Sequence, residues 1–255
     1  MEGRRDETFE ATVHALEAAM ADCSARDDRA GYFAAMYLAV TRTVQARAAA
    51  GRFDDPARME RFVAHFAGRY LDAYDGWRAG RPIAASWTIA FRTSRRWRPI
   101  ALQHLLLGMN AHINLDLGVT AAEFAGVDGL ATVRRDFDAI NHVLADLVDA
   151  CQSAVGTVSP WIDLADRVSG PGDEAIVRFS LVAARRQAWR AAERLAELQG
   201  ADRDRAATEI DEAAARIGRC VCNPGLRGNL VLLIVRMRER ARPREVIRIL
   251  NEVRV

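Results

Sequence analysis

Apolar residues recur along this chain at the three- and four-residue intervals of helices, and no stretch keeps the strict alternation typical of a strand. Clusters of glycine and proline separate the periodic segments. The pattern predicts helices over 6–24, 28–50, 56–79, 84–94, 98–117, 129–156, 173–199, 203–219, 227–241 and 244–254. We therefore expect an all-α, single-domain multi-helix bundle over 1–255, in which 220–255 forms a terminal helical appendage.

The segment 98–117 is unusual because its polar positions lie on two sides of the predicted helix. At about 100° per residue, one slowly drifting stripe contains His104, Gly108, His112 and Asp116. A second stripe on the far side contains Gln103, Asn110 and Asn114. Leucine, isoleucine and alanine fill the sectors between the stripes. A helix with no plain solvent face is expected to be the buried central helix of the bundle.

Polar groups in a buried helix need partners, since an unpaired one costs roughly 2–7 kcal/mol. His112 and Asp116 are one turn apart, about 6 Å along the axis, so both side chains can reach one metal ion. His104 lies about 12 Å from His112 on the same axis and needs a kink at Gly108 to join it. We therefore expect His112 and Asp116 as metal ligands, with His104 as a further ligand or a general base.

Two later segments offer partners for this site. In 129–156, Asp136 lies inside the apolar face and Asn141 lies at its edge, so Asp136 is expected as a catalytic group and third metal ligand. The connection 118–130 is short enough to return this helix antiparallel to the first. In 173–199, Arg185 shares a stripe with the apolar face and could hold an anionic group of the substrate.

The amides of the central helix and its neighbour offer a further layer of contacts. Asn110, Asn114 and Asn141 could orient a ligand or the metal-bound groups. They could equally cap neighbouring helices. His104 also has a structural interpretation. A single buried histidine is more often a core residue with a hydrogen-bond partner than a catalytic group.

The amino-acid composition excludes several kinds of catalytic and cofactor site. The chain has no lysine, so all 36 basic residues are arginine, which excludes Schiff-base and Walker-type lysines. It also lacks a glycine-rich phosphate loop and a Gly-x-Ser-x-Gly elbow, so no nucleotide cofactor is indicated. A net charge of +2 gives no clear sign of a nucleic-acid partner, and the arginines of the C-terminal segment alternate with glutamates without interleaved aromatic residues.

Location is inferred from the ends and the cysteines. The first residues are charged and no signal-peptide core follows them, and the apolar run 230–235 is too short for a membrane span. Four cysteines in a chain of 255 residues are typical of reduced thiols. We expect a cytoplasmic protein.

Several motifs together resemble an uncharacterised bacterial family, the domain of unknown function numbered 5995. They are Phe66, Arg69-Tyr70-Leu71-Asp72-Ala73, Trp87, Gln103-His104-Leu105-Leu106-Leu107-Gly108, Asn110-Ala111-His112-Ile113-Asn114-Leu115-Asp116-Leu117, Asp136-Phe137 and Ile140-Asn141. The resemblance covers most of the chain. It implies an all-α fold and brings no established activity.

A weaker similarity is to the zinc-dependent phospholipase C and single-strand nuclease class. These helical enzymes also use His-x-x-x-Asp on a helix as metal ligands, and His112 and Asp116 match that spacing. Those enzymes are secreted, use an N-terminal tryptophan as a ligand and have more histidines. This chain begins Met1-Glu2 and has five histidines, which puts a trinuclear zinc site in doubt.

Three functions remain open at this point. The first is a metal-dependent helical hydrolase of an ester or phosphoester, with a small-molecule substrate and a divalent zinc, iron or manganese ion. The second is a non-enzymatic helical small-ligand-binding or interaction protein, in which the same cluster is a structural network. The third and most distant is an isoprenoid-type cyclase suggested by Asp27-Asp28, which lacks a partner motif rich in aspartate. The sequence leaves the oligomeric state open.

Overall fold

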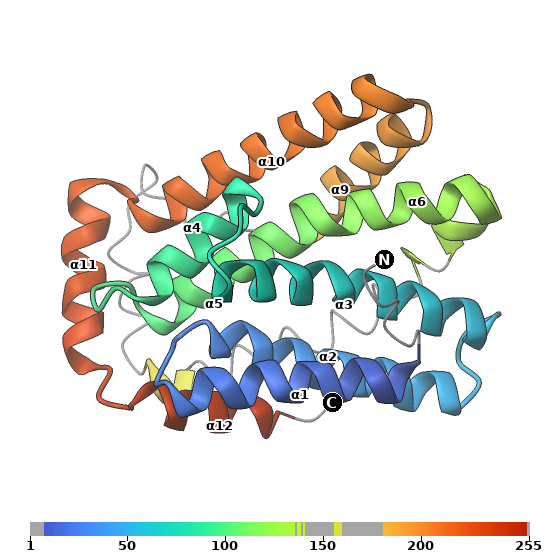
Figure 1. Cartoon of the computed structure of the whole chain (residues 1–255). Helices are drawn as coiled ribbons and strands as arrows, with labels where there is room; N and C mark the ends of the chain where they lie inside the picture. The colour runs from blue at the N-terminus through green and yellow to red at the C-terminus, as the bar shows by residue number, and fades with distance from the viewer. Residues whose placement is uncertain (1–7, 136, 139, 141–155, 160–180, 254–255) are drawn as a thin grey trace.

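The computed structural model describes residues 8–135, 137–138, 140, 156–159 and 181–253. Within these ranges the chain forms helices and no strand, which confirms the all-α class (Figure 1). The elements are α1 (Phe9–Ala25), α2 (Gly31–Ala49), α3 (Pro56–Arg78), α4 (Ala85–Ser94), α5 (Ala101–Ala111), the π-helical η1 (His112–Leu117), α6 (Gly118–Asp128), α9 (Leu181–Ala196), α10 (Gly200–Cys222), α11 (Gly225–Arg238) and α12 (Pro243–Asn251). None of the described helices is long and apolar enough to cross a membrane.

Helix ends follow local signals in the sequence. The Asp55 carboxylate accepts a hydrogen bond of 2.9 Å from the Arg58 amide, and Pro56 occupies the first turn of α3. Gly129 ends α6 with φ of 81°, a conformation that glycine adopts without strain. Such local signals end each helix and let the chain turn, so that the apolar faces of successive helices can pack together.

The helices surround the central run α5–η1–α6 from two sides. On one side α1 packs on α2 and α3, and α12 packs on α2 and α1 (Figure 1). On the other side α10 packs against α4 and α5, while α9 packs against α6 and η1. Helix α11 stands across one end of the molecule. The expectation of a buried central helix is confirmed, because η1 and most of α5 are buried.

The central run is longer than the pattern predicts. Gly118 was expected to end the helix at 117, but the helical run continues from Ala101 to Asp128. Both of its buried glycines serve close packing instead. A Cβ on Gly108 would lie 2.5 Å from Phe33 Cγ of α2, and a Cβ on Gly118 would lie 2.9 Å from the Ala188 carbonyl oxygen of α9. The predicted loop at 118–130 is therefore wrong for 118–128, which is helical, and α6 ends at Gly129.

Two large apolar clusters make up most of the core of the described residues, and a small third one joins Ile100 to Leu232 and Val235 of α11. The first joins α1, α2, α3, α4 and α5, and includes Val246, Ile247 and Leu250 of α12. The second joins α3, η1, α6 and α9 with Phe137 and Ile140, which lie in the predicted helix 129–156. The described residues 130–135, 137, 138 and 140 of that segment are helical. The π-helical segment passes from the first cluster, at Ala111, to the second, at Ile113.

Candidate functional site

The centre of the candidate site is the π-helical segment His112–Leu117. A π turn is wider than an α turn, it is rare, and it is often found at functional sites. His112 is the first residue of this segment and Asp116 the fifth, and they are only 3% and 4% exposed. The predicted pair is therefore brought together inside the protein, at a local irregularity of the backbone.

His112 and Asp116 form a hydrogen-bonded pair. The His112 Nδ1 atom lies 2.9 Å from Asp116 Oδ2, and Trp87 of α4 donates its indole N–H to the same oxygen at 3.0 Å. Burial lowers the pKa of His112, although the hydrogen bond to Asp116 opposes that shift. A neutral His112 therefore carries its proton on Nδ1, where the carboxylate accepts it, and keeps the lone pair on Nε2.

Aromatic side chains enclose the imidazole of His112. Its ring stacks on Phe66 of α3, with the centroids 3.7 Å apart and the planes 9° from parallel. The other ring centroids within reach lie at 4.5–6.4 Å, and they belong to Phe33, Tyr37, Tyr70 and Trp87. We call the five residues whose rings surround His112 the aromatic cage: Phe33, Tyr37, Phe66, Tyr70 and Trp87. Helices α2, α3 and α4 thus each contribute to the surroundings of His112.

Three polar atoms of this cluster are buried without a hydrogen-bond partner among the described residues. They are His112 Nε2 and the hydroxyl oxygens of Tyr37 and Tyr70. Burial raises the pKa of both tyrosines well above the usual value, so both hydroxyls keep their protons. The cluster therefore contains one lone pair that can accept a proton and two hydroxyls that can donate hydrogen bonds. Buried polar atoms of this kind are normally satisfied by water or a ligand.

A charged group lies beside Phe66 on α3. Glu123 of α6 is bonded to His65 Nε2 at 2.7 Å and also to Arg69, so it links α6 to α3 on both sides of Phe66. Burial raises the pKa of Glu123, but the contacts with His65 and Arg69 outweigh it and bring the pKa to about 2. Phe66 is only partly buried, and His65 is exposed. Phe66, which stacks on His112, is thus flanked on α3 by two residues that bind Glu123.

The amides of the central helix face α10 instead. Asn110 donates to the Ala214 carbonyl oxygen at 2.8 Å, and Asn114 donates to Asn110 Oδ1 at 2.9 Å. Gln103 donates to the Val221 carbonyl oxygen at 2.7 Å. These bonds fix α5 and η1 to α10. A role of Asn110 and Asn114 in orienting a ligand stays a prediction.

His104 is buried in different surroundings from His112. Its ring meets the edge of the Tyr32 ring, with the centroids 5.7 Å apart. Burial and the charges of Arg29 and Arg236 lower its pKa to about 3. His104 and His112 lie on one continuous helical run, eight residues apart. The role of His104 as a ligand or general base stays a prediction.

Arg185 of α9 is buried against the segment that follows Gly129. Its guanidinium donates to the Phe137 carbonyl oxygen at 2.5 Å and lies 4.4 Å from the centre of the Phe137 ring. Burial lowers its pKa to about 10. The predicted residues Asp136 and Asn141 lie outside the described residues. The Asp27-Asp28 pair forms the turn before α2, where the Asp28 carboxylate accepts from the Ala30 amide at 2.9 Å.

Sequence reasoning missed the groups that complete the site. Phe66, Tyr70 and Trp87 were noted only as positions of the family resemblance, and Tyr37 and Phe33 were not noted at all. The useful signal is the buried carboxylate itself, because it needs donors and a tryptophan can only donate. Glu123 carries no comparable signal, since its partners His65 and Arg69 come from a helix far away in the sequence.

The described residues contain no group of three or more His, Cys, Asp or Glu side chains placed to hold an ion. His112 Nε2 is the atom through which the pair could bind one, with Asp116 behind it on Nδ1, as carboxylates commonly support metal-bound histidines. The predicted third ligand Asp136 lies outside the described residues.

Comparison with known proteins gives one match. The profile described as "Family of unknown function (DUF5995)" matches residues 9–224. No curated protein and no solved structure matches the chain.

Proposed function

The chain belongs to the family of unknown function DUF5995, and we propose that it is an acid–base enzyme that hydrolyses an uncharged small ester within the aromatic cage. The observation that carries this proposal is the unpartnered Nε2 of His112, behind which Asp116 holds the proton of Nδ1. A general base must have a free lone pair at working pH, and burial keeps His112 in that neutral form.

The proposed step uses water as the nucleophile. His112 Nε2 takes a proton from water while the water oxygen attacks the ester carbonyl carbon, and the imidazolium that forms is stabilised by Asp116. A hydroxyl of Tyr37 or Tyr70 donates to the oxygen that becomes negative. The tetrahedral intermediate then collapses: the bond between the acyl carbon and the alkoxy oxygen breaks, and the imidazolium gives its proton to that oxygen, so that the alcohol leaves and the acid remains. No atom of the protein forms a covalent bond in this sequence.

The surroundings favour an uncharged substrate with apolar groups over a phosphoester. The five rings of the cage offer apolar contact, and Arg69, whose charge acts on His112, is bonded to Glu123. A buried anion would add to the charge of Asp116, and Arg69 already balances the charge of Glu123.

The test compares the effects of the same substitution at two histidines. Hydrolysis of a series of p-nitrophenyl esters is measured for the wild type, His112→Gln, and His14→Gln, a matched change at an exposed histidine of α1. We expect His112→Gln to lose at least about 100-fold in kcat/KM, and His14→Gln to keep the wild-type value. Equal rates in the wild type and His112→Gln would contradict the proposal. Circular dichroism checks that the variant keeps its helices.

A metal-dependent hydrolase is the second candidate, because Nε2 of His112 is equally suited to bind an ion. Elemental mass spectrometry on protein purified without a tag or chelator decides between the two. Zinc, iron or manganese near one ion per chain, lost in His112→Gln and Asp116→Ala, would favour the metal-dependent reaction. Metal-free protein with full esterase activity would favour His112 as the base.

A structural network remains the non-enzymatic alternative. It predicts that the pair contributes only to stability, so breaking it should cost roughly 3–5 kcal/mol with no ligand effect. Native mass spectrometry of the purified chain tests this directly, because a small molecule bound in the wild type and absent from Tyr70→Phe would contradict a purely structural role.

A further inference from the structure

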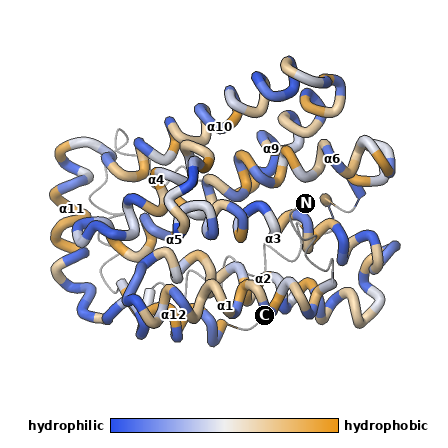
Figure 2. Tube along the Cα trace, viewed as in Figure 1, coloured by the Kyte–Doolittle hydropathy of each residue, from blue (hydrophilic) through white to orange (hydrophobic). Residues whose placement is uncertain are grey.

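Helix α11 is apolar on two opposite faces. Its inward face carries Gly228, Leu232 and Val235, which are buried. Its outward face carries leucine and methionine at spacings of four, three and four residues, within a sector of about 60°: Leu226, Leu230, Leu233 and Met237. Leu226 is 92% exposed, Leu230 62% and Met237 57%. Hydrophobic and hydrophilic colours accordingly alternate along this helix in Figure 2.

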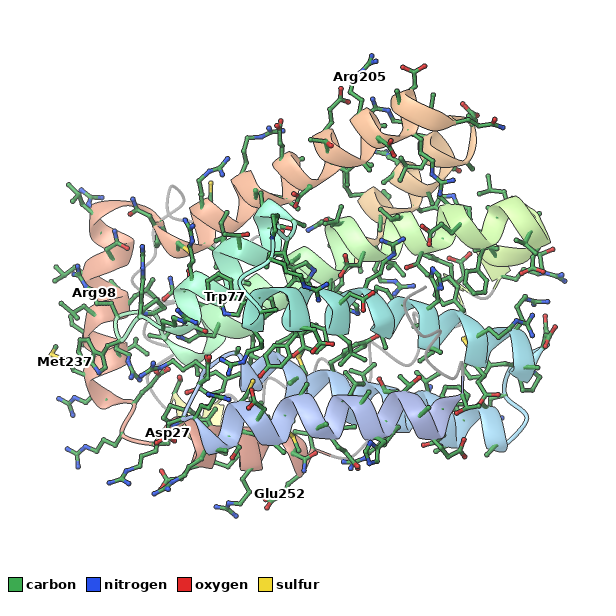
Figure 3. All side chains as sticks on the ribbon, viewed as in Figure 1. Asp27, Trp77, Arg98, Arg205, Met237 and Glu252 are labelled. Atoms are coloured by element: carbon green, nitrogen blue, oxygen red, sulfur yellow. The ribbon has the colours of Figure 1, made fainter. Side chains whose placement is uncertain are left out.

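The loop before α5 places an exposed tryptophan beside α11. Trp97 is 54% exposed, and it is held against α11 because Arg236 donates to its carbonyl oxygen at 2.6 Å and lies 5.3 Å from its ring centre. Figure 3 shows Arg98 and Met237 at the same end of the molecule, which is the end that α11 closes. Large exposed apolar side chains gathered in this way usually mark a binding surface.

The charges around this face are all of one sign in the two segments that form it. Residues 225–238 contain Arg227, Arg236 and Arg238 and no acidic residue, and residues 95–98 contain three arginines and Trp97. The acidic residue that follows, Glu239, is buried and paired with Arg236 at 2.9 Å. The exposed face therefore combines leucine, methionine and tryptophan with positive charge.

A second copy of this chain fits the face poorly. Two α11 helices in antiparallel contact would bring Arg227 of one near Arg238 of the other, and a parallel contact would bring equal arginines together. Four side chains are also few beside the roughly 20–30 residues that a stable interface takes from each partner. The positive charge of the arginines would be complemented by an anionic surface. The apolar side chains could be buried only if that surface also has an apolar interior.

We infer that the face formed by Leu226, Leu230, Met237 and Trp97 docks the protein on an anionic phospholipid membrane, with α11 lying in the plane of the surface. Helices of this kind bury their apolar side chains at the boundary of headgroups and acyl chains, while arginines meet the lipid phosphates. Tryptophan is enriched at the same depth. The inference is independent of the proposed catalysis, since no residue of this face belongs to the aromatic cage.

Vesicle co-sedimentation of the full chain tests the inference. The vesicles are phosphatidylcholine alone, or phosphatidylcholine with phosphatidylglycerol, at low and high salt. We expect binding to the anionic vesicles only, weakened by salt. The double variant Leu230→Asp/Met237→Asp should bind more than about tenfold less, because two apolar contacts are lost and negative charge is added. Leu226→Asp, at the most exposed position, should act in the same direction.

The matched control is Val127→Asp on α6, which is 85% exposed but far from α11 in sequence and outside this face. It should bind like the wild type. Wild-type protein that stays in solution with anionic vesicles would overturn the inference, as would binding unchanged by both aspartate variants. A concentration-dependent dimer that Leu230→Asp/Met237→Asp abolishes would also overturn it, because the face would then belong to a second copy.

Discussion

The two polar sides of the central helix differ in how their polar atoms are used. On the side toward α10, the amides of Gln103, Asn110 and Asn114 all donate hydrogen bonds, two of them to backbone carbonyl oxygens of that helix. On the side toward α2 and α3, Nε2 of His112 and the hydroxyls of Tyr37 and Tyr70 have no partner among the described residues. Both sides are equally buried, so burial alone does not separate structure from function.

The difference shows which polar residues to assign to folding. A paired buried amide repays its desolvation with a hydrogen bond and fixes two helices in register. An unpaired buried atom destabilises the fold unless something else binds it, and it persists where a ligand or a reaction uses it. The predictions below test this contrast, beginning with the side on which every amide is paired.

The largest effect on stability is expected for Asn110→Ala. It removes the bond to Ala214 and leaves the Asn114 amide without its acceptor, so the free energy of unfolding should fall by about 3 kcal/mol. Urea denaturation measures this change. Asn229→Ala, which breaks an exposed bond to Asn223, is the matched control and should cost less than about 0.5 kcal/mol. Similar losses in both variants would show that the α10 side is not a structural anchor.

Acid should destabilise the protein through His104. The pKa of His104 is about 3 in the folded chain, below the ordinary value of 6.5. Between these two values the unfolded chain binds a proton at His104 and the folded chain does not. The free energy of unfolding is therefore unaffected by this group above pH 6.5, and it decreases as the pH falls from 6.5 toward 3. At pH 5 the loss is about 2 kcal/mol, and His104→Phe should remove it. The measurement is the unfolding free energy at pH 7 and pH 5, and an unchanged pH dependence in the variant would contradict it.

Tyr70→Phe should leave the stability within about 1 kcal/mol of the wild type or raise it, because its hydroxyl has no partner among the described residues. Tyr74→Phe is the matched control, since Tyr74 donates to Asp22 Oδ2 at 2.6 Å, and it should lose about 1–2 kcal/mol. Thermal unfolding compares the two. A larger loss for Tyr70→Phe would place Tyr70 with the structural residues.

The smallest effect is expected at Glu123. The substitution Glu123→Gln weakens the contacts with His65 and Arg69, and because these groups are partly exposed the stability should fall by less than about 1 kcal/mol. The wild-type contribution of Glu123 to stability is present above pH 4.5 and is lost as the pH falls toward 2, since the pKa of Glu123 is about 2.

In the Glu123→Gln variant, the modification of His112 by diethyl pyrocarbonate, measured by peptide mass spectrometry, should become faster than in the wild type. An unchanged rate would show that this contact does not limit access to the cage.

The periodicity of the sequence predicted most of the fold, and the candidate site only in part. The helices 56–79 and 84–94 agree with α3 and α4 within a residue or so, because apolar spacing, Asp55, Pro56 and the glycines act locally. The pair His112–Asp116 was found because it lies within one turn of helix. The aromatic cage was not found, since Tyr37, Phe66 and Trp87 meet His112 only through packing of helices distant in sequence.

Glycine shows the same limit in another form. Gly118 was interpreted as a helix end, whereas it allows α6 to approach the backbone of α9. A glycine that permits a turn and a glycine that permits close packing look alike in one sequence. Only the neighbouring helix, which the local pattern cannot identify, distinguishes the two.

The π-helical segment also sets the rotational phase of everything that follows it. One residue more per turn rotates α6 by about 100° relative to α5, compared with an uninterrupted α-helix. That rotation is what lets Gly108 meet α2 while Gly118 meets α9. Deleting a single residue within 113–117 would restore an ordinary α-helix and turn one of the two glycines away from its neighbour. A change in the length of this stretch would therefore displace every residue that follows it, whereas a substitution within it acts only where it is made.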